Sequence, residues 1–193
     1  MARLPEPFKL NTYELARRAG EMKEYELDIA LLEKLGVELI SVPAGEVIEV
    51  DARLESVTEG ILLTAEIFAI AKGECTRCLD AVEVEIERKV QELYYYAQKA
   101  ERSRGKKSEE DLELDVEVEL MMDGDIMDLE SPIRDAIVLA LPINPLCGDD
   151  CQGLCPECGA KWADLPAEHA HQSIDARWAS LAGLDLPEAD FKN

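Results

Sequence analysis

Apolar and polar residues alternate along much of the chain, which is the pattern of β-strands that bury one face. Alternation is clear from 47 to 57 and again from 82 to 90, and a more apolar run extends from 61 to 71 between these two segments. The short stretch Thr58-Glu59-Gly60 fits a hairpin turn between the first two segments. Because the turns are short, the strands are expected to pair as antiparallel neighbours.

Further elements follow from the same reasoning. Residues 24–29 alternate as a strand, and residues 111–120 alternate strictly, with carboxylates on one face. Capping signals predict short helices, one from Tyr13 to Arg18 after Asn11 or Thr12, and one that starts at Ser131-Pro132 and ends at Leu141. The predicted fold class is therefore α+β: an antiparallel β-meander with a few short helices and a small C-terminal zinc-knuckle segment.

Length and composition fit one main domain with a small appendage. The chain has 193 residues, of which 47% are hydrophobic, and can bury a sizeable core. We expect an α+β core domain over 1–145, with a mobile loop near 97–110 that is rich in charge. Residues 146–193 would form a cysteine-rich zinc segment followed by a C-terminal helix and tail, in which Trp178 and Leu181 lie on one helical face.

Four thiols lie within a dozen residues after the predicted helix, at Cys147, Cys151, Cys155 and Cys158. The second pair has the Cys-Pro-x-Cys-Gly pattern of a zinc knuckle, in which backbone amides hydrogen-bond to the sulfurs. This spacing favours one zinc ion held by the four local cysteines, since short loops lose little entropy on closing. Four sulfurs leave no open position for water or substrate, so the predicted site is structural.

A rival ligand set combines the two CxxC pairs, Cys75 and Cys78 with Cys155 and Cys158, and leaves Cys147 and Cys151 spare. Either set predicts one ion per chain, and His169 and His171 are interpreted as solvated residues that could at most supplement a second site. A redox role for Cys75 and Cys78 is disfavoured, because such a motif needs a helix N-terminus and this pair lies between two predicted strands.

The formal net charge of −22 repels nucleic-acid phosphate over most of the surface. DNA binding is therefore not expected, and a basic protein partner is favoured. The one basic cluster, at residues 102–107, leaves open direct RNA binding through that loop. No apolar run approaches the roughly 20 residues that span a membrane. Clustered cysteines fit a reducing compartment, so a cytoplasmic protein is expected.

The chain resembles the YceD family, the large ribosomal RNA subunit accumulation proteins. The resemblance rests on motifs in order along the chain: Cys75-Thr-Arg-Cys78-Leu79, the apolar segment 136–143, the cysteine-rich stretch 151–159 and the Asp-x-Arg-Trp-Ala motif at 175–179. Some members of the family lack the C-terminal cysteines and keep the CxRC pair. The resemblance therefore implies that Cys75, Arg77 and Cys78 are the common element, whose role it does not define.

The family is implicated in synthesis, processing or stability of 23S ribosomal RNA, and its gene commonly neighbours that of ribosomal protein L32. The resemblance implies a non-enzymatic ribosome-biogenesis factor that contacts a large-subunit ribosomal protein or a pre-50S particle, with ribosomal RNA as an alternative partner. A thiol or metal enzyme is the least favoured alternative, because the sequence shows no base, nucleophile or open metal position. The partner itself and the oligomeric state do not follow from the sequence.

Overall fold

The computed structural model describes residues 7–96, 120–171 and 177. Contacts between residues divide the chain into two compact units, Met1–Cys151 and Gln152–Asn193. The first unit contains the sheets and the α-helix, and the second contains the last two cysteines and both histidines. Each unit is described by itself below.

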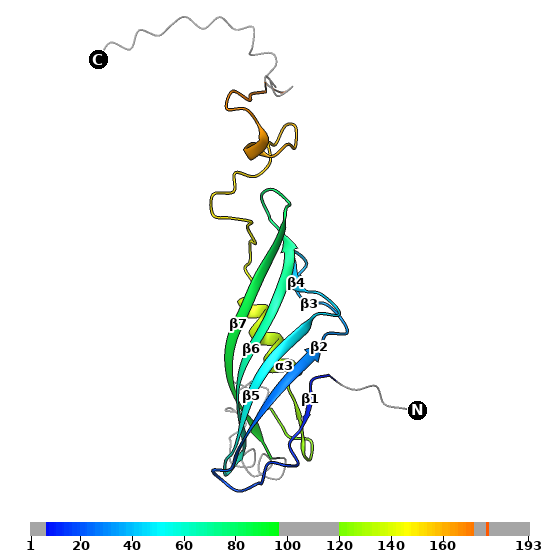
Figure 1. Ribbon diagram of the computed structural model, residues 1–193, viewed down its shortest axis with the longest axis vertical. Coiled ribbons are helices and arrows are strands. Elements are labelled where there is room, and N and C mark those ends of the chain that lie inside the picture. Colours follow the sequence, from blue (N-terminus) through cyan, green and yellow to red (C-terminus); the bar gives the residue numbers. More distant parts are fainter. Residues whose placement is uncertain (1–6, 97–119, 172–176, 178–193) are drawn as a thin grey trace, which may run out of the picture. The chain divides into compact units, whose positions relative to one another are not determined.

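A twisted antiparallel sheet forms the body of the first unit (Figure 1). Its long strands are β2 (Met22–Ala30), β5 (Val47–Ser56), β6 (Gly60–Glu74) and β7 (Ala81–Tyr95), and β6 is the central one. Strand β6 pairs with β5 on one side, and on the other it pairs with β7 over all 15 residues of both strands. This long hairpin places the β6–β7 loop at one end of the sheet.

Short strands complete the first unit. Strands β3 (Leu35–Gly36) and β4 (Ile40–Val42) form a small hairpin that extends the sheet beside the end of β6. Strands β1 (Lys9–Asn11) and β8 (Ile126–Asp128) pair with each other in a separate two-stranded sheet. These strands are too short to show an alternating pattern in the sequence, and they were not predicted.

Helix α3 (Glu130–Ala140) packs across one face of the large sheet, against β7, β3 and β6 (Figure 1). Its side chains Ile133 and Ile137 are buried against alternate residues of the strands. The core therefore lies between α3 and the inner face of the sheet, and the outer face is exposed to solvent. Within the described residues, no helix has the length and apolar character needed to cross a lipid bilayer.

The predicted α+β class is confirmed, and the strands expected from 47 to 90 form as predicted. The helix predicted from Tyr13 to Arg18 is wrong: this segment forms irregular turns. Thr12 instead bonds to Asp125 through both its amide and its hydroxyl, so contacts with the β8 region override the local capping signal. The 97–110 loop, most of the 111–120 strand and the C-terminal helix lie outside the described residues.

Candidate metal centre

The β6–β7 loop has the backbone geometry of a metal-binding knuckle. The Cys75 amide donates to the Asp80 carbonyl at 2.7 Å, and the Leu79 amide donates to the Cys75 carbonyl at 2.9 Å. These bonds close Cys75-Thr-Arg-Cys78 into a tight turn between the two strands, with Leu79 in the left-handed region at φ 61°. The turn brings both sulfurs of the CxxC pair to the same side.

A second segment, which follows α3, is hydrogen-bonded to this knuckle. The carbonyl of Pro145 accepts from the Thr76 amide at 2.9 Å and from the Thr76 hydroxyl at 3.3 Å. The guanidinium of Arg77 donates to the Cys151 carbonyl at 2.9 Å. Arg77 therefore has a positioning role in this structure, because it holds the Cys151 backbone beside the loop.

Four sulfurs meet where these two segments come together. The Sγ atoms of Cys75 and Cys151 are 3.8 Å apart, those of Cys78 and Cys147 are 3.4 Å apart, and all four lie within 4.8 Å of one another. A tetrahedral zinc with thiolates at about 2.3 Å requires neighbouring sulfurs about 3.8 Å apart. None of the four cysteines forms a disulfide. The donor set therefore fits a single thiolate-bound metal ion.

Burial and hydrogen bonding act in opposite directions on these thiols. Burial opposes ionisation of Cys75, but amides of Arg77, Cys147 and Cys78 donate to its sulfur and lower its pKa to about 6. At Cys78 the Asp80 amide favours the thiolate, yet burial and the neighbouring thiols outweigh it, and the pKa is raised. Four adjacent thiolates repel one another, so a cation is what allows all of them to ionise together.

The second knuckle lies in the other unit. Cys155 and Cys158 form a group with His169 and His171, and their ligand atoms also lie within 4.8 Å of one another. Both ligand sets expected from the sequence combine thiols of the two units, either Cys147 and Cys151 or Cys75 and Cys78 with Cys155 and Cys158. Because each set has ligands in both units, distances within one unit do not test it. Both sets remain predictions, and metal analysis of variants can decide between them.

A family model matches the part of the chain that contains the cysteine motifs. Residues 63–185, more than half of the chain, match the model of the family described as "Large ribosomal RNA subunit accumulation protein YceD". The chain belongs to the YceD family. The match starts in β6 and includes the Cys75 knuckle, Cys147, Cys151 and the second knuckle. All six cysteines of this YceD chain thus lie within the matched region.

Relatives of this YceD chain are found in mycobacteria. Proteins of Mycobacterium bovis and Mycobacterium tuberculosis are each 40% identical over 184 residues, which cover 95% of this chain and 84% of theirs. A Mycobacterium leprae protein is 36% identical over 174 residues, covering 90% of this chain and 76% of its own. All three are named as uncharacterized proteins. The search of solved structures gave no significant match.

Sequence reasoning did not find the grouping of Cys75 and Cys78 with Cys147 and Cys151. It weighed the short spacing of the last four cysteines and did not consider that α3 returns the chain to the β6–β7 loop. Signals for this return were present: Pro142 and Pro145 end the helix, and Cys147 follows at once. Thr76 and Arg77 hold the two segments together. The family resemblance included Arg77 in the CxRC motif without defining its role, and Thr76 was not singled out.

Proposed function

We propose that this protein is a non-enzymatic biogenesis factor of the large ribosomal subunit, which supports synthesis, processing or stability of 23S ribosomal RNA. Membership of the YceD family carries this proposal, since the family description names accumulation of the large ribosomal RNA. The factor acts by contact with a basic large-subunit ribosomal protein, free or in a pre-50S particle. It works in the cytoplasm, where reduced thiols persist, in agreement with six free cysteines.

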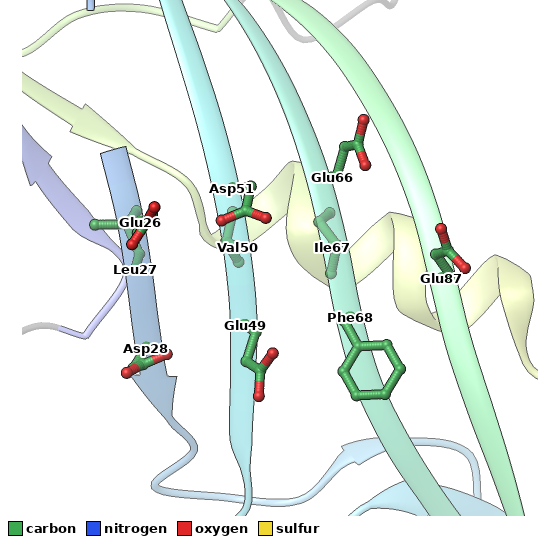
Figure 2. Close-up of a pocket in the computed structure, with 10 residues that line it drawn as sticks. All are labelled: Glu26, Leu27, Asp28, Glu49, Val50, Asp51, Glu66, Ile67, Phe68 and Glu87. Atoms are coloured by element: carbon green, nitrogen blue, oxygen red, sulfur yellow. The ribbon is translucent and has the colours of Figure 1, made fainter. Parts of the chain in front are cut away.

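The outer face of the sheet supports a basic protein as the partner. Carboxylates from four adjacent strands line a shallow hollow of about 340 Å³. Figure 2 shows how these side chains lie on the strands. In the register of the strands, Glu26 lies opposite Asp51, and Asp51 lies opposite Glu66. Three acids therefore form one row across β2, β5 and β6. Asp28 and Glu49 are paired in the next row. The described face thus presents two adjacent rows of negative charge.

This arrangement works against the stability of the sheet. Like charges directly opposite each other on neighbouring strands are destabilising, and only Glu66 has an ion-pair partner among the described residues of these rows, Lys89 at 2.5 Å. Lysine and arginine side chains of a partner would relieve the repulsion and steer association over a Debye length of about 8 Å. Half-buried Phe68, beside Glu49 in the register, adds an apolar contact. Phosphate groups of RNA would be repelled by the same face.

Zinc at Cys75, Cys78, Cys147 and Cys151 is proposed as the structural cofactor. Thiolates select soft or borderline metals, and a closed four-sulfur set is typical of structural zinc. Bound there, zinc supplies a cross-link between the β6–β7 loop and the segment after α3. The complete ligand set leaves no position for a substrate, which supports a non-enzymatic role.

The test is co-sedimentation of the purified chain with pre-50S particles. A variant with Glu26→Gln and Asp51→Asn removes two paired charges from the acidic face, and a control with Glu33→Gln and Glu38→Gln removes two exposed charges from the 31–39 region. Both variants have the same net charge. We expect the face variant to bind about tenfold more weakly at low salt, which corresponds to about 1.4 kcal/mol, and the control to bind like the wild type.

Two results would contradict the proposal. Tighter binding by the face variant would mean that the acids repel the target, as direct RNA binding requires. Binding to protein-free 23S ribosomal RNA, with no binding to the ribosomal proteins extracted from the particles, would likewise indicate RNA as the partner. Thermal unfolding of the face variant is the control for misfolding. Because this variant neutralises both acids of the Glu26–Asp51 pair, its sheet should be as stable as that of the wild type, or slightly more stable.

A further inference from the structure

The described residues 152–171 of the second unit have a defined backbone and very little core. Over residues 152–171, only Gly153 and Cys155 are buried. Nevertheless, the backbone is ordered by the bridge between Leu154 and Lys161, the short 3-10 helix η1 (Trp162–Asp164) and a bond from the Trp162 amide to the Gly153 carbonyl at 3.0 Å. A segment of this size cannot be stabilised by burial of one small side chain, and natural domains of this kind use a metal or disulfides. Cys155 and Cys158 are both free thiols, so a disulfide between them is not what holds it.

The knuckle in this unit repeats the backbone of a zinc-binding turn. The Cys155 amide donates to the Ala160 carbonyl at 2.7 Å, and the Gly159 amide donates to the Cys155 carbonyl at 2.8 Å. Gly159 has φ 71°, a conformation that glycine adopts without steric cost. Amides of Cys158 and Glu157 also donate to the Cys155 sulfur. The turn therefore presents two thiols in the geometry of a half-site for a metal ion.

Two histidines approach this half-site from the following loop. The Nε2 atom of His169 is 3.6 Å from the Cys158 sulfur and 2.8 Å from Nε2 of His171. A tetrahedral zinc with sulfur at about 2.3 Å and nitrogen at about 2.0 Å needs a sulfur–nitrogen edge of about 3.5 Å and a nitrogen–nitrogen edge of about 3.3 Å. The first distance fits, and a movement of about 0.5 Å by the exposed His171 ring satisfies the second.

The position of His169 is supported by its neighbours. Its ring makes an edge-on contact with Trp162, with centroids 5.5 Å apart, and its amide donates to the Pro166 carbonyl at 2.9 Å. These contacts turn the loop between Cys158 and His169 back onto the knuckle. A histidine that was simply solvated in an unstructured tail would not need such contacts. The sequence interpretation of these histidines as solvated did not take account of this loop.

We infer that Cys155, Cys158, His169 and His171 form a second zinc site, of the two-cysteine, two-histidine type, separate from the four-cysteine site. The chain then binds two zinc ions, and the second one stabilises residues 152–171. All four ligands lie within one unit and close only short loops, so the site forms without the sheet. Cys158 and His171 are exposed, and the ion exchanges faster with chelators than the ion of the four-cysteine site.

Metal analysis of the full-length chain and its variants tests this inference. We expect two zinc ions in the wild type and one each in Cys155→Ser, His169→Ala and Cys75→Ser. Glu168→Gln, beside His169, is the matched control and should retain two. Cobalt substitution provides an independent readout, since His169→Ala should remove the cobalt bands of a two-thiolate site and leave those of the four-thiolate site.

Each alternative gives a different result. A single zinc that is retained in His169→Ala and lost in Cys155→Ser would overturn the inference. Its additional loss in Cys147→Ser would establish a site of the last four cysteines, and its additional loss in Cys75→Ser would establish the rival set of the two CxxC pairs. One zinc lost only in Cys75→Ser would show that the second group binds no metal. The ribosomal role is measured separately, by co-sedimentation, so either proposal can fail without the other.

Discussion

The two CxxC turns of this chain have the same backbone hydrogen bonds and lie in opposite surroundings. In each turn the first cysteine amide bonds to the carbonyl five residues later at 2.7 Å, and the residue after the second cysteine donates back to the first. That residue is Leu79 in one turn and Gly159 in the other, and both have left-handed backbones. The Cys75 turn joins two paired 15-residue strands, whereas the Cys155 turn lies in a segment that buries almost nothing.

This difference shows that flanking strands can hold a residue in a strained left-handed backbone conformation. A left-handed leucine costs about 1–2 kcal/mol, which strand pairing from Glu74 to Ala81 can offset because it fixes both ends of the loop. In the described part of the second unit, a single isolated bridge between Leu154 and Lys161 flanks the second turn in place of two long strands. There the sequence uses glycine, and we propose that the metal supplies the remaining stability.

The largest effect is expected from loss of a thiol in the first turn. Cys78→Ser should lower the free energy of unfolding of the sheet unit by about 3 kcal/mol or more, since the ion closes a long loop between Cys78 and Cys147. Cys158→Ser should change the same transition by less than about 0.5 kcal/mol. Urea unfolding followed by the circular dichroism of the sheet measures both. Equal losses in the two variants would show that the turns are not independent.

A leucine at the second turn should have the next largest effect. Gly159→Leu reproduces the residue of the first turn without its strands, and the strain of about 1–2 kcal/mol should weaken zinc binding at Cys155 and Cys158 about five- to thirtyfold. Competition with a chromophoric chelator gives the affinity. Unchanged zinc affinity would mean that this segment tolerates the strain as the strand-bound loop does.

A substitution in the sheet unit that lies outside both turns provides a reference for the stability losses expected in the turn variants. The Tyr94 hydroxyl is buried and donates to the Asp128 carbonyl at 2.6 Å, and burial, with the charges of Asp128 and Glu92, raises its pKa. Tyr94→Phe should cost about 1–2 kcal/mol, because the carbonyl loses its donor. Zinc content should stay at the wild-type value. A loss of metal in this variant would indicate that general destabilisation, and not ligand loss, empties the sites.

The smallest effect is expected from relieving the strain in the first turn. Leu79→Gly removes the left-handed leucine but adds freedom to the unfolded chain, so the net gain should be below about 1 kcal/mol. Leu79 is 61% exposed, and little packing is lost. Thermal unfolding of the zinc-loaded protein is the measurement. A clear destabilisation would show that Leu79 makes a contact that its exposure does not reveal.

Local patterns in the sequence predicted the long strands, because alternation from Ile48 to Ile86 reflects burial of one face and each strand extends over many residues. The helix expected at Tyr13 failed since its caps were outweighed by the bonds of Thr12 to Asp125, a partner more than a hundred residues away. The predicted start of α3 at Ser131 was close: the helix begins at Glu130, whose amide donates to the Asp128 carboxylate at 3.0 Å.

Sequence reasoning missed the grouping of the metal ligands for a related reason, which is that the grouping depends on contacts between distant segments. Loop entropy grows only slowly with length, so short spacing between Cys147 and Cys158 was a weak argument against a distant partner. What brings Cys75 and Cys147 together is the length of the β6–β7 hairpin and the direction of α3, which no local pattern encodes. The motif type itself, free cysteines in metal-binding spacing, was readable from the chain.

The separation of 69 residues between Cys78 and Cys147 also has a consequence for synthesis of the protein. At about 5–20 residues per second, the second thiol pair emerges roughly 3–14 s after the first. During that interval the β6–β7 hairpin can form with two thiols exposed. If the proposed zinc binds at these four cysteines, its capture is a late step, which follows synthesis of Cys151 at the end of the first unit.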